Sequence, residues 1–166
     1  MLKTEKYLDI IKHTTLTAVD LILIKDNRVL VGLRKNQPAK NMWFTPGVRT
    51  YKYETQNDAL KRVADSELGI KINPQNKKLL GVYDHTYNLN FQNDNFGTHY
   101  IVNAYLFKMD SNQEIKIDPQ HEEFKWMTLE EIEYNQSVHI YVKKYLGQIQ
   151  KFLKQLDTKN GFHIGM

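Results

Sequence analysis

The feature that most constrains this chain is a strand–loop–helix unit between residues 43 and 70. The Pro46-Gly47 pair ends a short apolar stretch and marks the turn out of it. Thr55 is a good helix N-cap, and Gly69 stands where a C′ glycine ends a helix. Between these caps, apolar residues recur at helical spacing: Ala59, Leu60, Val63, Ala64 and Leu68. The pattern predicts a helix over 55–68 that packs one face beside a sheet.

One face of this helix carries a sparse set of metal-ligating groups. Val63, Ser66 and Glu67 lie at i, i+3 and i+4, so they share that face. Together with Glu54, Arg62 and the closing glycine, they resemble the Nudix box, in which glutamates at all three positions hold catalytic divalent metals. Here only Glu67 remains, and Val48 replaces the glycine that opens the motif.

The loss of two carboxylates bears directly on the chemistry. Mg²⁺ is a hard cation that takes several oxygen ligands, so each missing carboxylate removes a ligand and a charge. One carboxylate cannot build a multi-metal cluster that activates water for attack at phosphorus. A single metal, completed by carbonyls and water, is still able to neutralise a diphosphate leaving group. This shortened box, with one glutamate in place of three, therefore predicts either a reaction other than metal-activated attack at phosphorus or no catalysis.

Length and composition bound the class of protein. A chain of 166 residues predicts one domain, spanning 1–166, with a proper hydrophobic core. The absence of cysteine excludes disulfides, thiolate zinc sites and a cysteine nucleophile. The net charge of +4 mildly favours an anionic ligand, whereas no aromatic–basic interleaving indicates nucleic-acid binding. No apolar run is long enough to span a membrane and the N-terminus is unlike a signal peptide, so we expect a cytoplasmic protein without a membrane partner.

The rest of the chain predicts alternating strands and helices. Asp20 interrupts an apolar strand, where a carboxylate is costly unless it has a partner, faces a cleft or caps the strand end. A capping box, Thr128 to Glu131, starts a late helix. The other predicted elements are a weak helix over 5–12, strands over 14–24, 29–33, 79–87, 98–109 and 124–127, and a C-terminal amphipathic helix over about 138–156.

Several further segments resemble the GDP-mannose mannosyl hydrolases, the Nudix branch that lacks the standard glutamates. The segment DPQHEEFKW places Gln120 and His121 ahead of a short strand and the capped helix. Together with the shortened box, the matching segments span roughly residues 14 to 130. The other matching residues are Asp20 in LTAVDLIL, Arg34 after VGL, Arg49, Arg62, His85 in GVYDHTY, and His99 and Tyr100 in FGTHYIV.

The resemblance implies an α/β Nudix fold with a mixed β-sheet between helices, and a homodimer. It implies a Mg²⁺ site, with Mn²⁺ as the alternative, formed by Glu67, Gln120 and the Gly47 carbonyl. Water attacks carbon 1 of the sugar and a nucleoside diphosphate leaves. The roles it implies are His121 as general base, Arg49, Arg62 and Asp20 in catalysis, and Arg34, Tyr100, His85 and His99 in substrate binding. Imidazole suits a general base near neutral pH, and arginine suits phosphate.

Two other functions stay open. The first is hydrolysis by attack at phosphorus, which would favour more carboxylates than this helix offers. The second is a non-catalytic module that binds a nucleotide, which the eroded box and Val48 support. Valine resists the positive φ that glycine permits, so we expect the loop presenting Arg49 to be shaped differently from that of the family. Arg62 also has a structural reading, as a tie between helix and loop.

Overall fold

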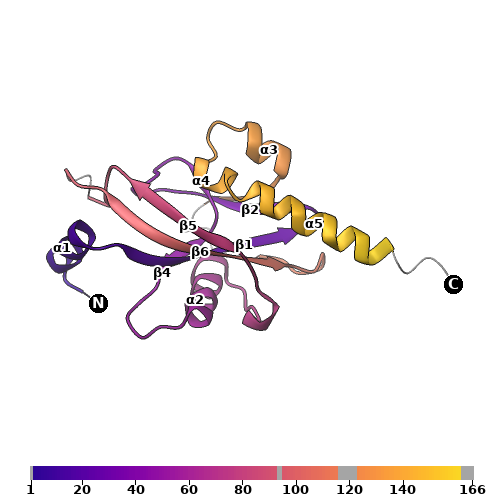
Figure 1. Cartoon of the computed structure of the whole chain (residues 1–166), viewed down its shortest axis with the longest axis horizontal. Coiled ribbons are helices and arrows are strands. Elements are labelled where there is room, and N and C mark those ends of the chain that lie inside the picture. The colour runs from indigo at the N-terminus through magenta and orange to yellow at the C-terminus, as the bar shows by residue number, and fades with distance from the viewer. Residues whose placement is uncertain (1, 93–94, 116–122, 162–166) are drawn as a thin grey trace.

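The computed structural model describes residues 2–92, 95–115 and 123–161, with the side chains of the last two residues of the third range left out. These residues form a seven-stranded mixed sheet between helices, as the sequence predicts (Figure 1). The path of the sheet is β3-β2-β1-β6-β5, while β4 pairs with β1 and β7 pairs with β2. The strands are β1 Leu16–Lys25, β2 Arg28–Leu33, β3 Trp43–Phe44, β4 Gly47–Arg49, β5 Lys78–Tyr87, β6 Thr98–Lys108 and β7 Phe124–Thr128.

The central strand β1 organises the sheet. It pairs antiparallel with β2 and β4 and parallel with β6. Because successive side chains of a strand point to opposite faces, Val19, Leu21 and Leu23 enter one core while Ile22 and Ile24 enter the other. Both faces of β1 are covered, which explains its nearly continuous apolar sequence.

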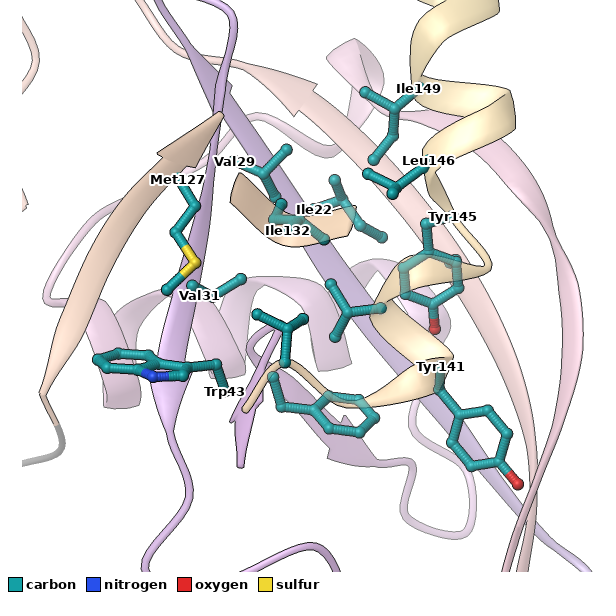
Figure 2. Close-up of a cluster of buried hydrophobic side chains, with 14 of the residues drawn as sticks. Ile22, Val29, Val31, Trp43, Met127, Ile132, Tyr141, Tyr145, Leu146 and Ile149 are labelled. Carbon is teal, nitrogen blue, oxygen red and sulfur yellow. The ribbon is translucent and has the colours of Figure 1, made fainter. Parts of the chain in front are cut away.

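The helices cover the two faces of the sheet. On one face lies α2, Gln56–Leu68, whose buried residues belong to the core that contains Leu21. On the other face lie α3 Leu129–Tyr134, α4 Ile140–Lys143 and α5 Leu146–Gly161 (Figure 1). Figure 2 shows Tyr141 of α4, Leu146 and Ile149 of α5, and Tyr145 from between the two helices extending into the second core. Helix α1, Thr4–His13, precedes the sheet, and the short η1, Pro74–Asn76, precedes β5. No helix of the described part of the chain is long and apolar enough to cross a membrane.

The helix caps are confirmed. The Thr55 side chain accepts a hydrogen bond from the Asp58 backbone, and Gly69 ends α2 in the left-handed region with a φ of 61°. Thr128 and Glu131 form a reciprocal capping box at the start of α3.

The C-terminal helix differs from its prediction. A single helix over 138–156 is wrong, because the chain forms α4, breaks at Lys144 and Tyr145, and resumes as α5. Val138 forms a β-bridge with Trp43, and His139 accepts a hydrogen bond from the Tyr141 backbone as the N-cap of α4. Tertiary pairing therefore delays the start of the helix beyond what the apolar pattern indicates.

Val48 causes no backbone strain, so strain at this position gives no reason for the loop that presents Arg49 to have a different shape. Val48 lies in β4, a short strand that the sequence did not predict, and pairs with Val19 of β1. An extended position of this kind favours a β-branched residue, and it needs no positive φ. The Val48 side chain is half-buried against the core beneath α2.

Candidate functional site

A cavity of about 130 Å³ opens beside β1 on the face that carries Asp20. It lies where β1, β4, β5 and β6 meet, so residues distant in sequence share its wall. Its lining residues are Ala18, Asp20, Arg34, Pro38, Phe44, Thr45, Gly47, Val48, Arg49, His85, Tyr87, Tyr100 and Val102. The structure thus brings together six of the predicted site residues: Asp20, Arg34, Gly47, Arg49, His85 and Tyr100.

A second pocket, of about 170 Å³, adjoins the first. Glu67 of α2 lines it, and Arg34 and Gly47 line both pockets. Its lining residues are Gly32, Arg34, Asn36, Phe44, Thr45, Pro46, Gly47, Glu67 and Phe124. The two pockets therefore form one cleft, with a carboxylate at the α2 end and the Asp20 side chain in the other part.

Asp20 is buried, with 5% of its surface exposed. Its Oδ2 accepts hydrogen bonds from the Tyr145 hydroxyl at 2.7 Å and the Thr45 hydroxyl at 3.2 Å. Burial raises the pKa of Asp20 from 3.8 to about 6, although these hydrogen bonds and the positive charge of Arg34 lower it. Two hydroxyl donors therefore satisfy one oxygen of the buried carboxylate. These partners, and the cavity that Asp20 lines, explain how a carboxylate is tolerated in an apolar strand.

His85 is clamped between aromatic rings in the wall of the cavity. Its imidazole is parallel to the Tyr141 ring, with centroids 4.1 Å apart and an interplanar angle of 1°. Burial, together with the positive charges of His139 and Lys144, lowers the pKa of His85 from 6.5 to about 4. The imidazole is therefore neutral near pH 7 and can both donate and accept a hydrogen bond.

Arg34 occupies the junction of the two pockets. Its backbone is fixed by the following loop, since its N–H donates to the Met42 carbonyl and its carbonyl accepts from Asn41. Among the described residues, Arg34 Nε is the buried side-chain polar atom that has no hydrogen-bond partner. An unpartnered buried guanidinium N–H is costly unless a ligand satisfies it, so Arg34 is suited to hold an anionic group in the cleft.

Arg49 and Arg62 have different surroundings. Arg62 donates to both carboxylate oxygens of Glu54, at 2.7 and 2.9 Å, and to the Arg49 carbonyl at 2.8 Å. Arg62 does not line the cavity, so the structure places it as the tie between α2 and the preceding loop. Arg49 lines the cavity, and its guanidinium lies 4.5 Å from the Tyr7 ring centroid and 5.1 Å from that of Tyr51.

Two predicted substrate-binding residues, His99 and Tyr100, lie on opposite faces of β6. Tyr100 lines the cavity, and burial raises the pKa of its hydroxyl, so it is present as a neutral donor. His99, its neighbour in β6, points to the opposite face, where its Nε2 lies 2.8 Å from an Asp84 carboxylate oxygen. The structure therefore places His99 on the surface, away from the cavity.

The groups predicted to hold a metal are only partly described. Glu67 and Gly47 line the same pocket, whereas Val63 is buried in the core and Ser66 is exposed. Gln120 and His121 lie outside the described residues. Within the described ranges, no group of three or more His, Cys, Asp or Glu side chains could hold a metal ion. These residues fit a single hard cation with one carboxylate and one backbone carbonyl, and they do not fit a multi-metal cluster.

The sequence interpretation missed three residues of the site. Thr45 and Tyr87 have no predicted role in the site, and Tyr145 lies within the amphipathic helix predicted over about 138–156. Tyr87 lines the cavity, and Thr45 and Tyr145 bond to Asp20. The buried carboxylate itself was the available signal, since it requires hydroxyl partners of this kind.

Comparison with known proteins places this cleft in context. The family model for the NUDIX domain matches residues 14–146. The low-salt glycan biosynthesis protein Agl8 of Haloferax volcanii is 35% identical over 140 residues, which cover 84% of this chain and 85% of that protein. An ADP-ribose pyrophosphatase of Methanocaldococcus jannaschii is 42% identical over 66 residues, which cover 40% of this chain and 38% of that protein.

Solved structures share the fold. A MutT Nudix hydrolase from Burkholderia pseudomallei has a TM-score of 0.66 and 24% identity, covering 82% of this chain and 98% of that chain. The Nudix domain of Shewanella oneidensis NrtR, complexed with ADP ribose, has a TM-score of 0.63 and 17% identity, covering 92% of this chain and 99% of that chain.

Proposed function

Since this chain belongs to the Nudix family, we propose that it is a sugar-nucleotide hydrolase that converts GDP-mannose and water to GDP and mannose. The observation that carries the proposal is the position of Arg34, which lines both the pocket of Glu67 and the cavity of Asp20. A diphosphate held at this junction would have its leaving-group charge next to a guanidinium. The similarity to a protein named for glycan biosynthesis supports a substrate that carries a sugar.

The proposed metal site consists of Glu67, the Gly47 carbonyl and Gln120. Mg²⁺, or Mn²⁺ in its place, would supply positive charge to the diphosphate as it leaves. Arg34 and Arg49 line the cleft and add two guanidinium groups that can bind phosphate oxygens bidentately. Tyr100 adds a neutral hydroxyl donor from the β6 wall.

The sugar is proposed to lie beside Asp20 and His85, whose side chains line the cavity. His121 takes the proton of the attacking water. The oxygen of that water forms a bond to carbon 1 of the sugar, and the bond from carbon 1 to the diphosphate oxygen breaks with its electron pair going to GDP. A base for water is needed on the sugar side in this reaction, and an imidazole has a suitable pKa.

Attack at phosphorus is the second candidate. The similarity to the ADP-ribose pyrophosphatase of M. jannaschii is the observation that favours it. The presence of Val63 and Ser66 disfavours it, because neither side chain supplies the carboxylate oxygens that would hold the metal ions for attack at phosphorus. A non-catalytic nucleotide-binding module is the third.

Product identification separates these candidates. The protein is incubated with GDP-mannose and Mg²⁺ in heavy-oxygen water, and the products are analysed by phosphorus NMR and mass spectrometry. Mannose together with GDP that carries no heavy oxygen supports attack at carbon 1. GMP with mannose 1-phosphate, labelled on a phosphate, would overturn it in favour of attack at phosphorus. Absence of turnover across a panel of sugar nucleotides would leave the binding module as the better description.

The cytoplasmic location and the homodimer are also proposals. Light scattering coupled to size-exclusion chromatography tests the dimer directly, since a dimer would have twice the 19.6 kDa mass of the chain.

A further inference from the structure

Tyr145 is a buried residue whose hydroxyl reaches the candidate site from the far end of the chain. It lies at the break between α4 and α5, and none of its surface is exposed. Its ring packs edge-on against the Tyr83 ring, with centroids 4.8 Å apart. Figure 2 shows the ring entering the core from the C-terminal segment. Tyr145 does not itself line the cavity, so any influence on a ligand passes through its neighbours.

The hydroxyl of Tyr145 connects two residues that do line the cavity. It donates to Asp20 Oδ2 at 2.7 Å and lies 3.2 Å from His85 Nε2. A hydroxyl has one proton, so once it donates to Asp20 it must accept from His85. This arrangement assigns the His85 proton to Nε2 and leaves Nδ1 as a hydrogen-bond acceptor.

The same hydroxyl also selects which oxygen of Asp20 remains available. Oδ2 accepts from both Tyr145 and Thr45, whereas Oδ1 lies against the Gly47 backbone at the cavity wall. The Tyr141 ring, stacked on His85, fixes the plane of the imidazole, and the Tyr141 hydroxyl is held by the Thr86 backbone. Two acceptors, Asp20 Oδ1 and His85 Nδ1, are thus oriented by one bridging hydroxyl.

We propose that Tyr145 is a positioning residue that makes this cleft selective for the hydroxyl groups of a sugar. A pair of oriented acceptors matches the O–H donors of a hexose and rejects epimers whose hydroxyls point elsewhere. The inference rests on the proposed function, because it concerns the sugar end of the same substrate. Tyr145 would act on the substrate through Asp20 and His85 and not by direct contact, and the C-terminal segment that carries it would thereby be part of the site.

The test uses Tyr145→Phe in the full chain, with Tyr83→Phe as the matched control. Both variants remove one phenolic hydroxyl from the same pair of packed rings, but only the first removes the bridge between Asp20 and His85. Thermal unfolding of both variants shows whether the fold is kept. Nitrogen NMR of protein labelled at histidine then reports the tautomer of His85 without any substrate.

Kinetics provide the second readout. We expect Tyr145→Phe to lower kcat/KM for GDP-mannose by about 10-fold or more, and to lower its selectivity over GDP-glucose by a similar factor. The affinity for GDP, which lacks the sugar, should stay within about twofold of the original protein. Tyr83→Phe should retain both the selectivity and the tautomer.

The outcomes separate this proposal from the proposed function. A His85 protonated at Nδ1 in the original protein, or a tautomer that Tyr145→Phe leaves unchanged, overturns the positioning role even if GDP-mannose is hydrolysed. An equal loss of affinity for GDP and GDP-mannose also overturns it, since that result indicates general damage. If no sugar nucleotide is hydrolysed, the proposed function fails. The comparison of GDP with GDP-mannose binding, together with the tautomer, then decides the role of Tyr145.

Discussion

Gly47 lies so close to Asp20 that a Cβ at position 47 would overlap Asp20 Oδ1. The two residues are direct partners in the pairing of β4 with β1, and both line the cavity. No side chain larger than hydrogen fits at position 47 unless the carboxylate or the strand moves. The position of the Gly47 backbone and that of the Asp20 carboxylate therefore depend on each other.

Gly47→Ala should consequently impair both activity and stability. The added methyl group displaces the Asp20 carboxylate or the β4 backbone, at a cost of about 1–3 kcal/mol in the free energy of unfolding. We expect kcat/KM to fall at least ~10-fold, since both pockets change shape. Urea unfolding and steady-state kinetics measure the two effects. Gly147→Ala is the control: no atom lies within 4 Å of a Cβ there, and alanine in an exposed helix should be neutral or stabilising by up to about 1 kcal/mol.

Val48→Gly should destabilise the protein without improving it as an enzyme. Valine occupies an extended, half-buried position in β4, so glycine loses packing and gains freedom in the unfolded chain, together about 1–2 kcal/mol. Denaturant unfolding checks the loss, with Val82→Gly on the exposed edge strand β5 as the comparison. A marked rise in activity on Val48→Gly would indicate instead that valine distorts the loop that carries Arg49.

Arg34→Lys should reduce turnover while the fold is retained. Lysine keeps the charge but loses the planar set of N–H donors that can serve both pockets, so we expect kcat/KM to fall about 100-fold. Arg28→Lys is the matched control, because the Arg28 side chain is exposed and its contact with Glu131 is a surface ion pair. That change should alter the rate less than about twofold. Equal rates for the two variants would remove Arg34 from the proposed diphosphate site.

Glu54→Gln should weaken stability in a pH-dependent way. The hydrogen bond from Arg62 holds the pKa of Glu54 below its ordinary value of 4.5, so the folded state binds fewer protons than the unfolded state. The stabilisation is complete above 4.5 and is lost as the pH falls through the folded value. We expect a loss of about 1–2 kcal/mol at neutral pH. The difference between the original protein and the variant should shrink in acid.

Unfolding free energies at neutral pH and well below pH 4.5 test this expectation. The exposed Glu133→Gln serves as the comparison, since it removes a carboxylate with no such partner and should change stability by less than about 0.5 kcal/mol. A constant difference between the Glu54 variant and the original protein at both pH values would show that packing, rather than charge, stabilises the loop.

Glu67→Gln should weaken metal binding, so the reaction should need more Mg²⁺. The amide keeps an oxygen but loses the charge, so the Mg²⁺ concentration for half-maximal rate should rise at least about 10-fold. Removal of divalent ions by a chelator should abolish turnover in the original protein, and added Mg²⁺ should restore it. Rates measured against free Mg²⁺ for this variant and for Glu133→Gln decide whether the effect is local to the cleft.

Sequence patterns predicted the parts of the fold whose signals are local. Thr55, Gly69 and the Thr128 capping box are recognised from a few adjacent residues, and each is confirmed. Strand β4 was missed because three residues carry too little pattern, and it exists through its pairing with β1. The break at Lys144 and Tyr145 was missed for a similar reason, since an uninterrupted helical period gives no sign of it.

The candidate site was predicted through resemblance rather than through periodicity. Matching segments indicated Asp20 of β1, Arg34 just after β2 and His85 of β5, which share a cavity although they are far apart in the sequence. The resemblance implied that His99 and Tyr100 both bind substrate. Because the side chains of a strand alternate between its faces, these neighbours in β6 point to opposite faces and only Tyr100 lines the cavity. The hydroxyl partners of Asp20 depend on long-range packing, which the local sequence does not contain.

The bond between Asp20 and Tyr145 joins residues 125 positions apart. Its consequence concerns the order in which the protein is made. The acid emerges from the ribosome early, within the first strand, while the hydroxyl that holds it is synthesised after β7, the last strand of the described sheet. A nascent or truncated chain that ends before Tyr145 leaves this carboxylate without one of its two hydroxyl donors. The cleft is therefore completed last, and activity should report on full-length synthesis.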